Sequence, residues 1–399
     1  MKNFGTLYCY ELKKLFQRKA VWAVVLLLAA IMAFFVWPPR YTGGYTATLT
    51  DRDGNTMSRY VSSNEQRELV RAGEQRISGQ VMDEAFFQRL REVSTGDSEY
   101  IIQEQLDLDS YFYLIDSSYF QPHDMVAYNM GLDPTTITAE EFYEARREVI
   151  QRQWDTEAKA TYWEAMEAQV EKPFIYQYYQ GYHDILSYVF GLSSLIPLAA
   201  AVCLCGVFSE EKRTRADALI FSSRQGRFPL YLAKVLAGLT AALVAGFLLV
   251  GANAAVILLT RGWAGFNTAL QLDNLTSSLP LSIGQAVLIM TGLLLLYGLL
   301  CGVAAMLLSA LTGSSVAALA GPVLFMVGQS WLRLDMQAAE YLPNQLFNTI
   351  PSLHNRNLVN LFGSYWNNLQ FAFLLYGALT VVLAALCWPL WRRSSDGRL

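Results

Sequence analysis

The amino-acid sequence predicts a mainly α-helical polytopic membrane protein. It has six transmembrane helices and an inserted, mostly helical extracytoplasmic domain with a small β-hairpin. Of its 399 residues, 53% are hydrophobic and only 16% are charged, whereas soluble domains carry about 25% charged residues. The charge is also uneven: residues 40–184 hold 13 Lys and Arg against 26 Asp and Glu, and the rest of the chain holds 17 against 8. We therefore expect the acidic and basic parts to face different compartments.

Residues 1–19 are predicted to form an amphipathic helix at the cytoplasmic membrane surface. Apolar residues such as Leu12 and Phe16 recur at helical spacing, with basic residues on the other side, which suits a helix lying in the interface. Residues 20–37 are uncharged and apolar, and at about 1.5 Å per residue they can cross a thin hydrocarbon core. The bulky residues before Pro38 are unlike a signal-peptide cleavage site, so we interpret this segment as an uncleaved first span.

Residues 40–184 are the one segment long enough for a separate soluble domain, and the first span places it outside the cell. Asp53-Gly54, between two β-prone runs, predicts a hairpin at its start. Thr138, followed by Glu141 three residues later, predicts the capped N-terminus of a helix. Further helices are expected over residues 64–93 and 98–115.

Five more apolar segments complete the six predicted spans, and none has a charged residue in its apolar interior. Gly298 and Gly302 lie four residues apart in one of them and predict close helix packing. The predicted boundaries are residues 185–208, 231–259, 284–311, 314–332 and 371–391 for the spans, 209–230 for a cytoplasmic loop, 333–370 for an outer-leaflet loop with short helices, and 392–399 for a cytoplasmic tail.

Basic residues predict the orientation of these spans. Residues 1–19, the stretch 208–234 and the tail supply 14 of the 17 Lys and Arg outside the acidic insert. Cationic side chains near membrane ends stay on the cytoplasmic side. Both chain termini are therefore predicted to be cytoplasmic, with the protein in the plasma membrane.

The stretch 208–234 carries the main functional signal. It contains six basic and three acidic residues. An apolar run occupies residues 216–221, and residues 222–227 can make a tight turn. The order of features resembles the permeases, the membrane subunits, of type-2 ABC exporters. The features that carry this resemblance are Ser209-Glu210-Glu211-Lys212-Arg213, Ala218-Leu219-Ile220, Ser222-Ser223-Arg224-Gln225-Gly226-Arg227, and Lys234 at the opening of the next membrane helix.

The resemblance implies a transport subunit and not an enzyme. In that family the loop packs on a cytoplasmic ABC ATPase subunit and passes its movement to the membrane helices. It also implies two half-transporters in the lipid bilayer, as a homodimer or as a heterodimer with a similar permease. The residues expected to contact the ATPase are Glu210, Glu211, Lys212, Arg213, Arg224 and Arg227.

The residues themselves predict no catalytic, cofactor-binding or metal site. The chain has no Gly-Lys dipeptide and hence no phosphate-binding P-loop, so ATP must be bound by a separate subunit. Its three histidines are isolated in the sequence, and the predicted spans lack the intramembrane charges that ion-coupled transporters usually need. His183-Asp184 is interpreted as an interfacial pair, with metal binding or pH sensing as alternatives. No nucleic-acid partner is expected.

Two functions remain open at this point. The first is the permease subunit of an ATP-driven exporter that moves a substrate such as a peptide or an amphipathic compound across the plasma membrane. The second is a membrane-anchored sensor or assembly protein whose extracytoplasmic domain binds a ligand. The acidic insert is consistent with a cationic substrate, although a solvated acidic surface is the more usual cause of such charge.

Overall fold

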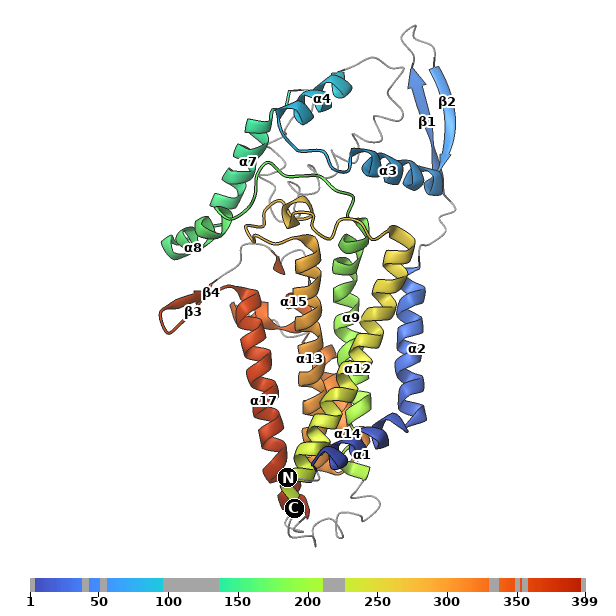
Figure 1. Cartoon of the computed structure of the whole chain (residues 1–399), viewed down its shortest axis with the longest axis vertical. Helices are drawn as coiled ribbons and strands as arrows, with labels where there is room; N and C mark the ends of the chain where they lie inside the picture. The colour runs from blue at the N-terminus through green and yellow to red at the C-terminus, as the bar shows by residue number, and fades with distance from the viewer. Residues whose placement is uncertain are drawn as a thin grey trace.

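The structure is a computed structural model, which describes residues 4–37, 43–50, 56–95, 136–210, 227–329, 337–348, 352–353 and 358–395. Over these residues, a bundle of long helices carries a smaller insert at one end (Figure 1). Helix α1 (Phe4–Phe16) lies at the opposite end of the bundle. We call the two ends the insert end and the α1 end.

Among the described residues, five helices are long and apolar enough to cross a membrane. The prediction of a multi-pass helical membrane protein is thus confirmed. A shorter apolar helix, α14 (Ser315–Gly328), has 14 residues and spans about 21 Å at 1.5 Å per residue, less than the hydrocarbon core of about 30 Å. The five long helices are α2 (Lys19–Val36), α9 (Gln180–Leu204), α12 (Arg227–Arg261), α13 (Ile283–Thr312) and α17 (Asn368–Ser395).

Local sequence signals set the ends of α13. Ser282 and Gln285 form a reciprocal capping box at its N-terminus, which satisfies backbone N–H groups that have no partner inside the helix. At its C-terminus Gly313 adopts a φ of 65°, a left-handed conformation that glycine takes without a Cβ clash. The chain can therefore turn sharply into α14 within two residues.

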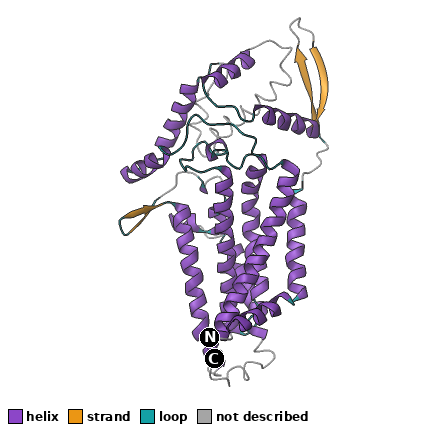
Figure 2. Cartoon of the chain, in the orientation of Figure 1, coloured by secondary structure: helices purple, strands orange, loops and turns teal. Residues whose placement is uncertain are grey.

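The insert contains one hairpin and four helices among its described residues (Figure 2). The predicted hairpin and the capping box of Thr138 with Glu141 are both confirmed. The helix predicted over 64–93 is two helices, because the chain turns at Gly79, where φ is 96°. The helix predicted over 98–115 lies outside the described residues. The elements are β1 (Gly44–Thr50), β2 (Thr56–Ser62), α3 (Ser63–Ile77), α4 (Glu84–Thr95), α7 (Ala139–Arg152) and α8 (Glu157–Glu167).

The segment before α17 contains the predicted short helices and also a second hairpin. The helices are η2 (Gln337–Tyr341) and α15 (Pro343–Leu346). The hairpin pairs β3 (Val359–Leu361) with β4 (Ser364–Trp366) in antiparallel register. This second hairpin was not expected from the sequence.

Two apolar cores hold the molecule together. The larger lies among the long helices. The smaller core of the insert is built around Phe87, Phe142 and Phe174, and it includes Leu272 and Leu275 from the loop between α12 and α13. The insert therefore packs on the membrane bundle through shared apolar contacts.

Gly302 and Gly298 lie where α13 packs against α9. An ideal Cβ at Gly302 would be 2.8 Å from Leu204 Cδ1, and one at Gly298 would be 2.8 Å from Ile196 Cγ2. These distances are shorter than any normal carbon contact, so even a Cβ at either position would force the facing Leu204 or Ile196 side chain to shift, and a larger side chain would have to displace more of α9.

Replacing Gly302 by leucine is expected to destabilise the bundle by about 1–3 kcal/mol, the usual cost of overpacking. Gly251→Leu on α12 is the matched control, because an ideal Cβ there meets nothing within 4 Å. Thermal unfolding in detergent would compare the two variants. Equal unfolding temperatures for the two would contradict the close packing of α9 on α13.

Candidate functional site

A buried ion pair joins α1 to α12 at the α1 end of the bundle. Lys234 Nζ lies 2.9 Å from Glu11 Oε1, and the two side chains are 0% and 11% exposed. A hydrogen bond of 2.8 Å between Tyr8 and Thr240 ties the same two helices together. Because a buried charge that loses its partner is costly, Glu11 and Lys234 hold α1 in a fixed place on α12.

The sequence predicts Lys234 at the opening of the membrane helix over residues 231–259, and the structure shows its side chain buried inside the bundle. Lys234 lies within α12, which begins at Arg227. Its partner was missed, although one signal was available: Glu11 is the only acidic residue among residues 1–19.

A second ion pair joins the connection between α1 and α2 to the residues that follow α9. Arg18 Nη2 lies 2.5 Å from Glu210 Oε2, with side-chain exposures of 15% and 38%. The guanidinium also lies close to the chain at Gly206, where an ideal Cβ would be 3.0 Å from Arg18 Nη1. Such a half-exposed pair contributes about 0–1 kcal/mol by itself. The position of the pair matters more, since Glu210 is the first of the predicted coupling residues.

Aromatic side chains anchor the chain on both sides of residues 211–226. Phe208 precedes that segment and packs on Trp391 of α17, with ring centroids 5.7 Å apart. Tyr231 follows it on α12 and packs on Trp388 of α17 at 5.2 Å. The two flanks of the segment are thus held on α12 and α17.

The structure describes the predicted coupling residues only in part. Glu210 is described and contacts Arg18. Arg227 is described as the first residue of α12. Four predicted residues lie outside the described part of the chain: Glu211, Lys212, Arg213 and Arg224.

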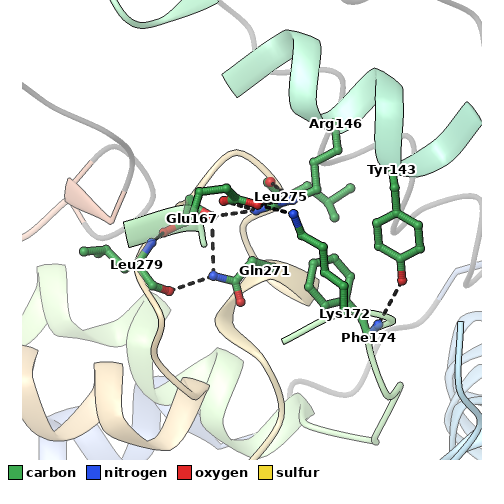
Figure 3. Close-up of polar contacts among 9 residues, drawn as sticks. Tyr143, Arg146, Glu167, Lys172, Phe174, Gln271, Leu275 and Leu279 are labelled. Atoms are coloured by element: carbon green, nitrogen blue, oxygen red, sulfur yellow. Dashed lines mark hydrogen bonds and ion pairs between the residues drawn. The ribbon is translucent and has the colours of Figure 1, made fainter. Parts of the chain in front are cut away.

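At the insert end, Arg146 of α7 ties the insert to the loop between α12 and α13 (Figure 3). Its side chain is 1% exposed. Nε donates to the carbonyl of Leu275 at 2.8 Å, and Nη2 donates to that of Ser277 at 2.9 Å. The guanidinium also lies 5.3 Å from the centre of the Phe174 ring. One buried side chain thereby satisfies two backbone carbonyls that the insert removes from water.

Glu167 of α8 balances the charge of Arg146. Its carboxylate contacts Arg146 Nη1 at 2.5 Å and Lys172 Nζ at 2.5 Å. Burial alone would raise the pKa of the Glu167 carboxyl, but hydrogen bonds and charge from Arg146 and Lys172 together hold that pKa below its ordinary value. The α12–α13 loop also has a hydrogen bond of its own, in which Gln271 Nε2 donates to the carbonyl of Leu279 at 2.7 Å (Figure 3).

A second group of polar contacts lies around the start of α9. His183 pairs with Asp273 of the α12–α13 loop, and Asp184 pairs with Arg261 at the end of α12. These partners support the interfacial-pair interpretation of His183-Asp184. The insert takes part as well, because Arg71 of α3 donates to the carbonyl of Thr260 at 3.2 Å.

Comparison with known proteins gives a family for the chain. The model of a family described as ABC-2 family transporter protein matches residues 19–388. A search of curated proteins finds no match.

Proposed function

The chain belongs to the ABC-2 transporter family, whose model matches residues 19–388, and we propose that it is the permease subunit of an ATP-driven exporter with a separate cytoplasmic ATPase chain. The observation that carries this proposal is the anchoring of both flanks of residues 211–226. Glu210 pairs with Arg18 on one side, and Tyr231 packs on Trp388 on the other. A force applied to this segment would reach α1, α12 and α17 together.

In this proposal the α1 end is cytoplasmic and the ATPase binds the 209–230 loop. Closure of the ATPase on ATP moves the loop, and α12 follows because it begins at Arg227, within the predicted 209–230 loop. The pair Glu11–Lys234 makes α1 follow α12. The chemistry is therefore conformational, with ATP hydrolysis on the partner chain and no covalent step on the permease.

The proposal also covers the assembly of the permease, its sixth span, its substrate and the side of the membrane on which the insert lies. Two permease copies, alike or similar, enclose the pathway in the plasma membrane, and the predicted segment 314–332, which includes α14, supplies the sixth span. The substrate is a peptide or an amphipathic compound, and the insert is extracytoplasmic. The acidic balance of residues 40–184 supports a cationic substrate, because a surface of one sign concentrates ligands of the other.

A ligand-binding sensor is the second candidate function, and the contact made by Arg146 favours it. A ligand that moved α7 would move the α12–α13 loop as well, because Arg146 bonds to that loop through Leu275 and Ser277. The sensor function predicts activity that does not depend on the 209–230 loop. The exporter function predicts the opposite.

Purification from native membrane in mild detergent tests the exporter proposal. We expect an ABC ATPase to accompany the wild type and to be lost from, or uncoupled in, the triple variant Glu210→Ala/Glu211→Ala/Arg213→Ala. The matched control removes two exposed acids and one exposed base from α7. Its substitutions are Glu140→Ala, Glu144→Ala and Arg147→Ala.

The two variants separate a specific contact from a general change of charge. The control should retain the ATPase and its activity. If no nucleotide-binding protein accompanies the wild type, the exporter proposal is wrong in this form. Equal retention and activity in both variants would show that the ATPase binds elsewhere on the permease.

A further inference from the structure

The β3–β4 hairpin has an aromatic residue at a turn position that disfavours one. Leu361 pairs with Ser364, which leaves Phe362 and Gly363 as a two-residue turn. Their φ angles are 52° and 87°, as in a type I′ turn, where both central residues have positive φ and Asn-Gly is the favoured sequence. A phenylalanine with positive φ is strained. The ring is also fully exposed, at 106%, so packing within the chain does not offset that strain.

The rest of the hairpin is also unlike a hairpin in water. No Asp, Glu, Lys or Arg occurs from Asn357 to Trp391. The hairpin of the insert gives the contrast within the same chain, because residues 44–62 include Asp51, Arg52, Asp53 and Arg59, and the sequence between its strands contains Asp53-Gly54. One hairpin thus has the composition of a solvated turn, and the other has that of a membrane-contacting one.

The location of the β3–β4 hairpin matches its composition. Strand β4 ends at Trp366, two residues before α17, which is a candidate span. Figure 1 shows the hairpin projecting sideways from the insert end of α17, away from the bundle. The outward face of α17 itself carries exposed apolar side chains such as Leu374 and Val381. The hairpin therefore continues an apolar surface that begins on a membrane-spanning helix.

The base of the hairpin is fixed while its tip is exposed. Asn368 Nδ2 donates to the carbonyl of Ser352 at 2.9 Å, and Asn367 Nδ2 donates to Tyr162 of the insert at 3.3 Å. Gly363 N donates to Asn360 Oδ1 at 3.0 Å, which closes the turn. The hairpin is thereby held at a defined height relative to both α17 and the insert.

We propose that the β3–β4 hairpin is a lipid anchor, lying in the bilayer interface at the insert end with the Phe362 ring among the lipid chains. Aromatic side chains favour that interface because their rings are apolar and the surroundings still hydrate polar atoms. Tyr365, 44% exposed on β4, lies beside the headgroups. The anchor fixes the depth of the insert over the membrane. The proposal depends on α17 crossing the membrane and not on any ATPase partner.

Spin labelling of the purified full chain in lipid nanodiscs tests the anchor directly. Cys9 is exposed and Cys205 is half-buried, so the background is Cys9→Ser/Cys205→Ala. A nitroxide is attached at Phe362→Cys or, as the control, at Tyr60→Cys on β2, where the native side chain is 59% exposed. Collision rates are measured with oxygen, which partitions into lipid, and with a water-soluble nickel chelate.

We expect the label at residue 362 to collide more with oxygen than with nickel, and the label at residue 60 to show the reverse. A ratio at residue 362 equal to that at residue 60 would overturn the proposal. Spin–spin broadening at residue 362 that disappears on dilution with unlabelled protein would also overturn it, because the tip would then contact a second copy and not lipid.

A turn substitution separates anchoring from folding of the hairpin. Phe362→Asn creates the favoured Asn-Gly turn, so it keeps the hairpin and removes only the ring. With the label at Tyr365→Cys, this variant should lower the oxygen-to-nickel ratio severalfold, while the unfolding temperature stays the same or rises because the strained phenylalanine is removed. Phe362→Leu should retain most of the ratio. Equal ratios for the asparagine and leucine variants would contradict insertion of the ring.

Discussion

Replacing Arg146 by alanine is expected to release the insert from the membrane helices and to cost about 3–5 kcal/mol of stability, the usual result of breaking a buried ion pair from one side. The variant leaves Glu167 without its buried partner and leaves the carbonyls of Leu275 and Ser277 without these donors. Arg147→Ala is the matched control, because Arg147 is exposed on the same helix. The measurements are thermal unfolding in detergent and the rate of tryptic cleavage within the insert.

Two further results would refine this prediction. Arg146→Lys should recover only part of the stability, because an ammonium group cannot make the forked contacts of a guanidinium. The contribution of Glu167 should depend on pH. Its pKa is lowered in the folded state, so its stabilising effect is present above the pKa of an unfolded glutamate and is lost as the pH falls through the folded value. If Arg146→Ala and Arg147→Ala unfold at the same temperature, the proposed anchoring is wrong.

Glu11→Gln is expected to have an effect of similar size at the α1 end, about 3–5 kcal/mol, because it leaves a buried ammonium beside a neutral amide. Lys234 is 0% exposed, so water cannot replace the lost carboxylate. The helix α1 should separate from α12, and transport should fall with it. Lys13→Met on the exposed side of α1 is the control, and both stability and transport are measured.

The double variant Glu11→Gln/Lys234→Met distinguishes a buried pair from two independent charges. It removes both ions, and such replacement of a buried pair is often nearly neutral. A double-mutant cycle should therefore give a large coupling energy, with the double variant more stable than Glu11→Gln alone. Additive losses would show that the two side chains do not act through each other.

The sequence predicted those features that depend on neighbouring residues. The capping box at Thr138 needs only Glu141, three positions away, and the first hairpin follows from Asp53-Gly54 between two β-prone runs. The second hairpin was missed because Phe362-Gly363 is a rare sequence for its turn, although the geometry is the usual one. Turn prediction depends on recognising the residues that favour positive φ, and Phe362 is not among them.

The contacts that organise both ends of the bundle could not be predicted in the same way. Arg146 bonds to a loop 129 residues further along the chain, and Arg18 pairs with Glu210, 192 residues away. No local pattern encodes such a pairing, because it arises only when the helices are packed. The family resemblance predicted a coupling role for the 209–230 loop but gave no sign of Glu11 or Arg18, since these residues contact the flanks of the loop from the N-terminal part of the chain.

The way in which Arg146 holds the α12–α13 loop has an evolutionary consequence. The guanidinium recognises main-chain oxygens of Leu275 and Ser277, and every residue type presents the same oxygen. These two bonds therefore persist through any substitution that keeps the path of the loop, although Leu272 and Leu275 are also held by their buried side chains. In related chains the arginine and the glutamate on the insert should persist as a pair even where the residue at position 277 differs, while position 275 stays apolar because its side chain lies in the core of the insert.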